Sequence, residues 1–295
     1  IGSSALGILI PPSIMLIVMA EQSGLTVGKL FAGAIIPGLI LSGLYITYIL
    51  YQSWRHPHKG PALSAEERAA VTAKQLMKML VLNLLPPLLL IISVLGVLFA
   101  GIATPTEASA SGCLFAFVLY VAYGKFNVKG FIKIVSEATR TSAMVLVVMI
   151  GATCFTGVFM GLGGGAVVKS LILGVGLGKW GTFLIMMLIS FFLGMFLDWI
   201  AIVMIVFPIY LPIAQALGFD ILWFVVAMAV MLQDSFCTPP FGYNLFYLKG
   251  CAPPEVTTKD IYLGAVPFWI LMEVGLVIVC VFPATITWLP AILVR

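Results

Sequence analysis

Long apolar stretches, each close to the length of a membrane span, recur from one end of the chain to the other. A helix of about 20 apolar residues crosses the hydrocarbon core of a bilayer, and these stretches lack the alternation over about ten residues that is typical of an outer-membrane strand. The composition agrees, because 62% of the 295 residues are hydrophobic, 9% are charged and the mean hydropathy is +1.19. The sequence therefore predicts an all-α protein that crosses a lipid bilayer several times.

Two of the predicted spans are unusual. We expect spans at about 13–20, 30–51, 80–100, 106–123, 142–160, 182–214, 221–248 and 262–283. The stretch 182–214 is too long for one crossing and contains GMFLDW, whereas 221–248 is interrupted by QDSFCTPPFGYN. The segments 51–80 and 123–142 mix charged and apolar residues at helical spacing, which predicts amphipathic helices that lie along the membrane interface.

Basic residues set the expected topology. The loops near residues 60, 130 and 255 are predicted to be cytoplasmic and residue 295 periplasmic, since this places 11 of the 15 lysines and arginines on one side. The 11 are Arg55, Lys59, Arg68, Lys74, Lys78, Lys125, Lys129, Lys133, Arg140, Lys249 and Lys259. The net charge of +4 thus reflects membrane orientation, and no nucleic-acid partner is expected. With this topology, 182–214 enters and leaves on the same side, as a re-entrant hairpin with GMFLDW at its tip.

The chain also contains an imperfect repeat of itself. Aligning the pair Pro11, Pro12 with Pro239, Pro240 places Pro37 within two residues of Pro267. Each copy consists of a broken helix, a polar loop and a full span, and the predicted loops lie on opposite faces. This pattern is typical of the inverted-topology repeats of secondary transporters. The first copy lacks a hairpin, so we expect roughly half as much sequence again upstream of Ile1.

The interrupted spans carry the predicted site. In TPPFG, Pro239 and Pro240 remove backbone donors and Gly242 permits unusual backbone angles, so carbonyl oxygens that can coordinate cations are freed at membrane depth. GMFLDW supplies a turn at Gly194 and the carboxylate of Asp198, whose charge needs a partner there. The alternative for Asp198 is a structural role as a helix cap. The symmetry-related candidates in LGILIPPS are Gly7, the Ile10 carbonyl and Ser13.

Other polar residues have simpler interpretations. Thr104 and Glu107 stand at the start of a span, where a threonine cap and an early carboxylate favour helix initiation. Glu273 lies in the middle of the last long span and should face protein, but no motif assigns it a role. The cysteines and histidines show no metal-ligand spacing, so neither a resident metal nor a cofactor is expected. The cysteines are Cys113, Cys154, Cys237, Cys251 and Cys280.

Four motifs in order, LGILIPPSI, GIATPTEASA, GMFLDWIAIVMIVFPIYLPIAQALGFD and TPPFGYNLF, resemble the large membrane subunit of tripartite ATP-independent periplasmic (TRAP) transporters. The resemblance implies an elevator-type fold of the ion-transporter superfamily and sodium-coupled uptake of a small organic anion across the bacterial inner membrane. It also implies two partners, a small membrane subunit and a periplasmic substrate-binding protein. Sodium ions would be the coupling ions, near Asp198 and Thr238.

The resemblance also assigns domains and residues. It divides the chain into a first-repeat transport segment (1–29), scaffold and arm helices (30–141), a second-repeat transport domain (142–250) with the hairpin 182–214 and the broken helix 221–248, and a last scaffold span (251–295). One cation and substrate region would be formed by Gly194, Asp198, Thr238, Pro239, Gly242 and Asn244. Half of another would be supplied by Gly7, Ile10, Pro11, Pro12 and Ser13. Trp199 and the segment QDSF depart from common members. Gln233 and Asp234 therefore mark either a substrate preference or a contact with the scaffold.

Two alternatives to a TRAP transporter remain. A sodium-coupled carboxylate carrier of the same superfamily would work without a binding protein. An intramembrane aspartyl protease could use Asp198 and Asp234, since two carboxyl groups in a membrane can share a proton. Neither aspartate lies in a GxGD context, and a protease does not need an inverted repeat. The sequence therefore favours a transporter subunit over an enzyme.

Overall fold

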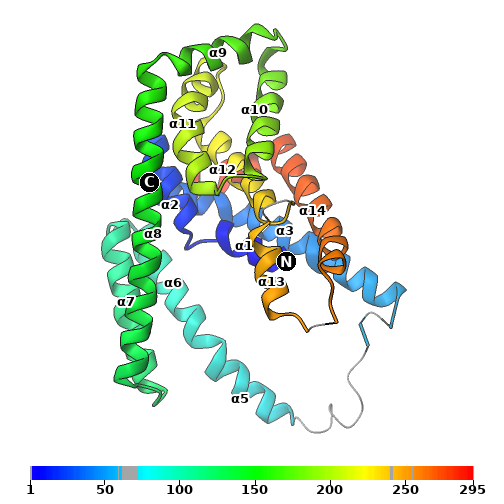
Figure 1. The fold of residues 1–295 in the computed structure, drawn as a ribbon. Helices are drawn as coiled ribbons and strands as arrows, with labels where there is room; N and C mark the ends of the chain where they lie inside the picture. The colour runs from blue at the N-terminus through cyan, green and yellow to red at the C-terminus, as the bar shows by residue number, and fades with distance from the viewer. Residues whose placement is uncertain (1, 59, 62–71, 240–241, 254, 295) are drawn as a thin grey trace. The chain divides into compact units, whose positions relative to one another are not determined.

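The computed structural model describes residues 2–58, 60–61, 72–239, 242–253 and 255–294, and these residues form helices without strands (Figure 1). Two compact units are present: residues 2–45 with 138–293, and residues 46–137. Helices α3 (Val27–Arg55) and α8 (Val128–Gly161) contribute residues to both units. Lys59, Arg68, Pro240 and Arg295, which the sequence interpretation used, lie outside the described residues.

Among the described residues, six helical stretches are long and apolar enough to cross a membrane. They are α3, Lys74–Phe99, α7 (Pro105–Ala122), α8, α11 (Trp199–Ala216) and α14 (Thr258–Val281). A bent pair, α1 (Gly2–Leu9) and α2 (Ile14–Ser23), makes a seventh candidate, with 42° between its halves. The chain is therefore a polytopic α-helical membrane protein, as the sequence predicts.

The second unit contains α5 (Ala73–Asn83), α6 (Leu85–Phe99) and α7. Helix α6 packs on α7, where Gly112 leaves room for Val94, and the Tyr123 hydroxyl donates to the Leu82 carbonyl. Helix α7 starts with the predicted cap. The Glu107 N–H donates to Thr104 Oγ1 (3.3 Å), and the Thr104 N–H donates to the Glu107 carboxylate (2.8 Å). The helix-initiating role of these two residues is confirmed.

Helix α8 differs from the sequence expectation of an interfacial segment followed by a separate span from residue 142. The structure has one helix of 34 residues with no end near 142. No proline interrupts it, and the i,i+4 pair Lys133–Glu137 (3.9 Å) lies on its polar first part. Because nothing breaks the backbone hydrogen bonding, the polar segment continues directly into the apolar one.

The core of the first unit surrounds α12 (Ile221–Leu232), whose residues from Trp223 to Leu232 are all buried. Helices α2, α10 (Gly178–Gly194), α11, α14 and α15 (Ala284–Leu293) pack against it. The 3-10 helix η1 (Gln233–Phe236) and then α13 (Tyr243–Cys251) follow α12, whereas α9 (Gly164–Gly174) precedes α10. Helix α12 has no exposed residue within this unit, which fits its uniformly apolar sequence.

Helices α10 and α11 lie side by side and are joined by residues 195–198 (Figure 1). At the opposite end of this helix pair, the Lys179 ammonium donates to the Gly218 carbonyl (2.8 Å) and lies 4.4 Å from the centre of the Phe219 ring. Trp223 stacks on Phe219, with ring centroids 5.4 Å apart. These contacts fix the base of the pair and so set where its tip can lie.

Candidate functional site

Three interruptions of helical structure meet at one cavity of about 430 Å³ in the first unit, which we call the central cavity. One interruption separates α1 from α2, the second is the tip between α10 and α11, and the third follows η1. The cavity is lined by Ile8, Ile14, Thr141, Met144, Val145, Val148, Asp198, Trp199, Ile200, Phe236, Asn244 and Tyr247. Among these lining residues, Asp198 alone carries a charge.

The break between α1 and α2 is held by Ser13. Its hydroxyl accepts a hydrogen bond from the Leu16 N–H (3.3 Å) and donates to the Ile8 carbonyl. The last backbone bond of α1 runs from the Ile10 N–H to the Leu6 carbonyl (2.8 Å). A helix end leaves its final carbonyl groups without intrahelical partners, so the predicted role of the Ile10 carbonyl is chemically reasonable. The Ser13 hydroxyl, by contrast, already serves as the cap of α2.

The other predicted groups of this break differ in position. Gly7 is exposed, and a Cβ added there would meet nothing within 4 Å. Pro11 is buried and Pro12 is exposed. The central cavity is lined by Ile8 and Ile14 and not by Gly7, Pro11 or Pro12. The first break therefore borders the cavity through its flanks, and the predicted binding roles of its central residues remain predictions.

At the tip of the α10–α11 pair, Asp198 is the N-cap of α11. Its carboxylate accepts a hydrogen bond from the Ile200 N–H (3.4 Å). The turn is not made by glycine, because Gly194 is the buried last residue of α10 and the turn bonds run from Met195 and Phe196 to Phe192 and Leu193. Asp198 is half-buried and also lines the central cavity. The same residue therefore caps the helix and lines the cavity.

The third interruption is built around the carbonyl group of Asp234. The Thr238 hydroxyl (2.8 Å) and the Thr238 N–H (2.9 Å) both donate to it. The Thr238 carbonyl accepts from the Gly242 N–H (3.0 Å), and Gly242 adopts φ 23°, which a residue with a Cβ rarely adopts. Asn244 donates through Nδ2 to the Cys237 sulfur (3.7 Å), which leaves its amide oxygen for another partner.

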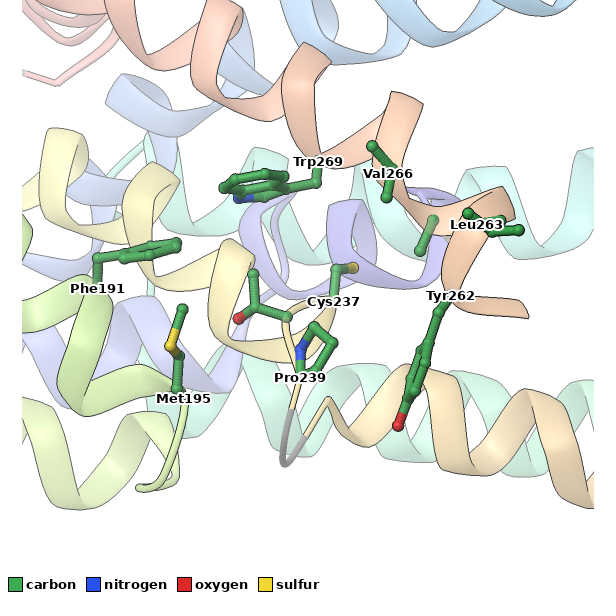
Figure 2. A pocket seen from close by; sticks show the side chains of 10 residues that line it. Phe191, Met195, Cys237, Pro239, Tyr262, Leu263, Val266 and Trp269 are labelled. Carbon is green, nitrogen blue, oxygen red and sulfur yellow. The ribbon is translucent and has the colours of Figure 1, made fainter. Parts of the chain in front are cut away.

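Thr238 and Pro239 line a different space. They line an apolar cavity of about 240 Å³. In Figure 2, Phe191 and Met195 lie on one side, Trp269 and Val266 of α14 on another, and Cys237 and Pro239 between them. The structure thus brings Asp198 and Asn244 together at the central cavity but places Thr238 at this second cavity. Met195 lines this cavity together with Thr238, so the tip of the α10–α11 pair borders both spaces.

Gln233 and Asp234 are buried in η1 and line neither of these cavities. The Asp234 carboxyl group instead faces Glu273 of α14. Of the two roles that the sequence leaves open, this geometry favours a contact with the last long helix over a contact with substrate.

Several lining residues were missed by the sequence reasoning. Thr141, Val148 and neighbouring residues come from α8, where one face turns toward the cavity. The sequence of the apolar part of α8 does not indicate which face lines the cavity, because valine and methionine occur both on faces that contact lipid and on faces that line cavities. Phe236 and Tyr247 flank the TPPFG motif, so a wider window around that motif would have included them.

Gly38 of α3 provides a test of the first break. A Cβ at Gly38 would lie 2.6 Å from Cγ1 of Ile10, whereas a Cβ at Gly43 would meet nothing within 4 Å. We expect Gly38→Ala to lower the melting temperature and slow uptake, since overpacking costs about 1–3 kcal/mol. Gly43→Ala on the same helix is the control and should be neutral or stabilising. Equal behaviour of the two variants would show that Ile10 can move without consequence.

Comparison with known proteins places these features in a family. The chain matches the family described as "Tripartite ATP-independent periplasmic transporter, DctM component" over residues 1–285. It is 32% identical, over 98% of its length, to the C4-dicarboxylate TRAP transporter large permease protein DctM of Pseudomonas aeruginosa. It is 31% identical, over 99% of its length, to a Salmonella typhimurium protein named "Uncharacterized protein YgiK", and 29% identical, over 98% of its length, to the sialic acid TRAP transporter large permease protein SiaM of Vibrio cholerae.

The chain spans 66%, 65% and 66% of the lengths of these three proteins, respectively. The DctM and SiaM relatives are named as transporter permeases and not as enzymes. Both the family match and the identity extend over nearly the whole chain, including the three helix interruptions. The chain belongs to the DctM family of tripartite ATP-independent periplasmic transporters.

Proposed function

We propose that the chain is part of the large membrane subunit of a sodium-coupled secondary transporter that imports a small organic acid across the bacterial inner membrane. The observation that carries the proposal is the central cavity, where Asp198 is the one charged lining residue among interrupted helices. A carboxylate at membrane depth is costly without a cation, and freed carbonyl oxygens suit a hard ion such as sodium. A bound sodium ion would offset the charge of Asp198 and allow an anionic substrate to enter.

The transport step would follow the elevator pattern. The α10–α11 pair would be a re-entrant hairpin, and it would move with η1, α13 and the first break as a transport domain. Irregular backbone at membrane depth is tolerated where it lines a water-filled cavity, which supports this role for residues 195–198. Asn244, Thr141 and Tyr247 offer amide and hydroxyl groups for the substrate carboxylate, and Trp199 offers an apolar surface.

Two partners belong to the proposal: a small membrane subunit, and a periplasmic binding protein that delivers the organic acid. The test is uptake by proteoliposomes that contain the complete transporter, with and without binding protein, under an inward sodium gradient. We expect uptake only with both the gradient and the binding protein. Uptake without binding protein would indicate the superfamily carrier alternative, and uptake that ignores sodium would overturn the coupling.

The membrane orientation is a separate prediction. In a variant without the five native cysteines, a cysteine at Glu255 should be protected from an impermeant thiol reagent in spheroplasts, whereas one at Lys29 should react. The reason is the excess of basic residues on the side that carries residues 60, 130 and 255. Labelling at both positions before and after membrane permeabilisation measures this, and the reverse pattern would invert the topology.

A further inference from the structure

Asp234 is buried without a donor group or a basic partner. It is 1% exposed, and in the described part of the chain no N–H, hydroxyl or basic group donates to either of its carboxyl oxygens. Gln233 beside it is 0% exposed, and both polar atoms of its amide also lack partners. Unsatisfied polar groups are rare in protein interiors and destabilise them, so each such group calls for an explanation. Two adjacent residues with four unsatisfied atoms indicate a missing binding partner.

Glu273 brings a second carboxyl group to the same place. It lies in the middle of α14, which packs against η1, and its carboxyl group faces that of Asp234. Glu273 also lines a groove of about 430 Å³ between α10, α12 and α14, where it is the one charged lining residue. The Asp234–Glu273 pair, which we call the acid pair, is therefore reached from this groove and not from the central cavity.

Tyr45 of α3 adds a third oxygen nearby. Its ring packs edge-on against Phe268 of α14 (5.4 Å between centroids), and its side chain is 4% exposed. The hydroxyl has no hydrogen-bond partner among the described residues, and it lies close enough to Asp234 to interact with its charge. Tyr45 of α3 and Glu273 of α14 thus both bring oxygen atoms near Asp234 of η1.

No basic side chain neutralises the acid pair. The side-chain ion pair that the described residues form is Lys133–Glu137. It is exposed and lies far from Asp234 and Glu273 in the sequence. Two carboxylates in an apolar environment repel each other, and each loses hydration. A cation between them would remove both costs. The described residues contain no group of three or more histidine, cysteine, aspartate or glutamate side chains that could hold a metal, so a monovalent ion fits better than a transition metal.

We propose that Asp234 and Glu273 bind a sodium ion at a second site, separate from the central cavity, with Gln233 and Tyr45 as neutral oxygen ligands. Only the identity of the ion rests on the proposed sodium-coupled function. A proton shared between Asp234 and Glu273 would join one oxygen of each, and it would leave the other Asp234 oxygen and the Gln233 amide oxygen without partners. Hard oxygen ligands and a single positive charge suit sodium, and the groove gives the ion a path to Glu273.

The test is a count of sodium ions bound to the purified complete transporter, measured with radioactive sodium in choline buffer at constant pH. Asp234→Asn and Glu273→Gln preserve shape and each remove one charge. We expect either variant to bind one ion fewer than the wild type, or to need about tenfold more sodium for the same occupancy. The matched control is Glu21→Gln, which neutralises an exposed acid on α2 and should bind the wild-type number.

The melting temperature is a second measurement that tests the proposal if one variant is expressed poorly. In sodium-free buffer, both acid-pair variants should melt at a higher temperature than the wild type, because the repulsion between the two carboxylates is gone. Wild-type ion counts in both variants would overturn the second site while leaving the proposed function intact. Absence of sodium binding in the wild type would overturn both. A changed pH profile of uptake with an unchanged ion count would assign the pair to a proton instead, against our proposal.

Discussion

Val148→Trp is expected to abolish uptake of the organic acid while leaving the protein folded. Val148 lies on α8 and lines the central cavity of about 430 Å³. An indole ring in place of an isopropyl group would fill space that the substrate needs, because ligand cavities are close to the size of what they bind. We expect the initial rate of sodium-driven uptake in proteoliposomes to fall about 100-fold or more, which corresponds to about 2.7 kcal/mol.

The neighbouring residue provides the control for this substitution. Val147 is 69% exposed in the first unit and does not line the cavity, so Val147→Trp adds the same volume on a different face of α8. It should transport at nearly the wild-type rate. Both variants should retain sodium binding and a melting temperature near that of the wild type. Normal uptake by Val148→Trp would mean that substrate does not pass through the central cavity.

The sequence predicted where the helices break better than what the breaks do. Interruptions at Pro11–Pro12, at GMFLDW and at TPPFG were all found near the predicted positions. Proline alone was a poor guide, because Pro37, Pro208 and Pro267 lie inside continuous helices. A single proline costs a membrane helix little when neighbouring groups satisfy the freed carbonyl. One break contains the pair Pro11, Pro12 and another contains Pro239 and Gly242 at φ 23°, whereas residues 195–198 contain neither proline nor glycine.

Contacts between distant segments could not be read from local patterns. The sequence placed Asp198 and Thr238 at one site, but the structure gives them different cavities, because the tip of the α10–α11 pair lies between two spaces. Glu273 carried no motif, and only the packing of α14 against η1 shows that it faces Asp234. The polar residues of the Thr104 cap, in contrast, are three positions apart, so their geometry follows from helix initiation alone.

Asp198→Asn is expected to raise the sodium concentration for half-maximal uptake by about tenfold, because it removes the charge that we propose offsets the ion. The structure shows that Asp198 also caps α11. Asparagine caps helices nearly as well as aspartate, whereas alanine does not and costs about 1 kcal/mol at a cap. Asparagine therefore removes the charge and keeps the cap, and alanine removes both.

Comparison of these two variants separates the two roles of Asp198. If the carboxylate assists the ion, both variants should shift the sodium dependence of uptake alike, and Asp198→Ala should in addition melt at a lower temperature. If Asp198 only caps the helix, Asp198→Asn should transport with wild-type sodium dependence and the defect should appear in Asp198→Ala alone. Thr238→Ala tests the position of the ion in the same assay. An unchanged sodium dependence there would confine the ion to the central cavity, since Thr238 borders the other space.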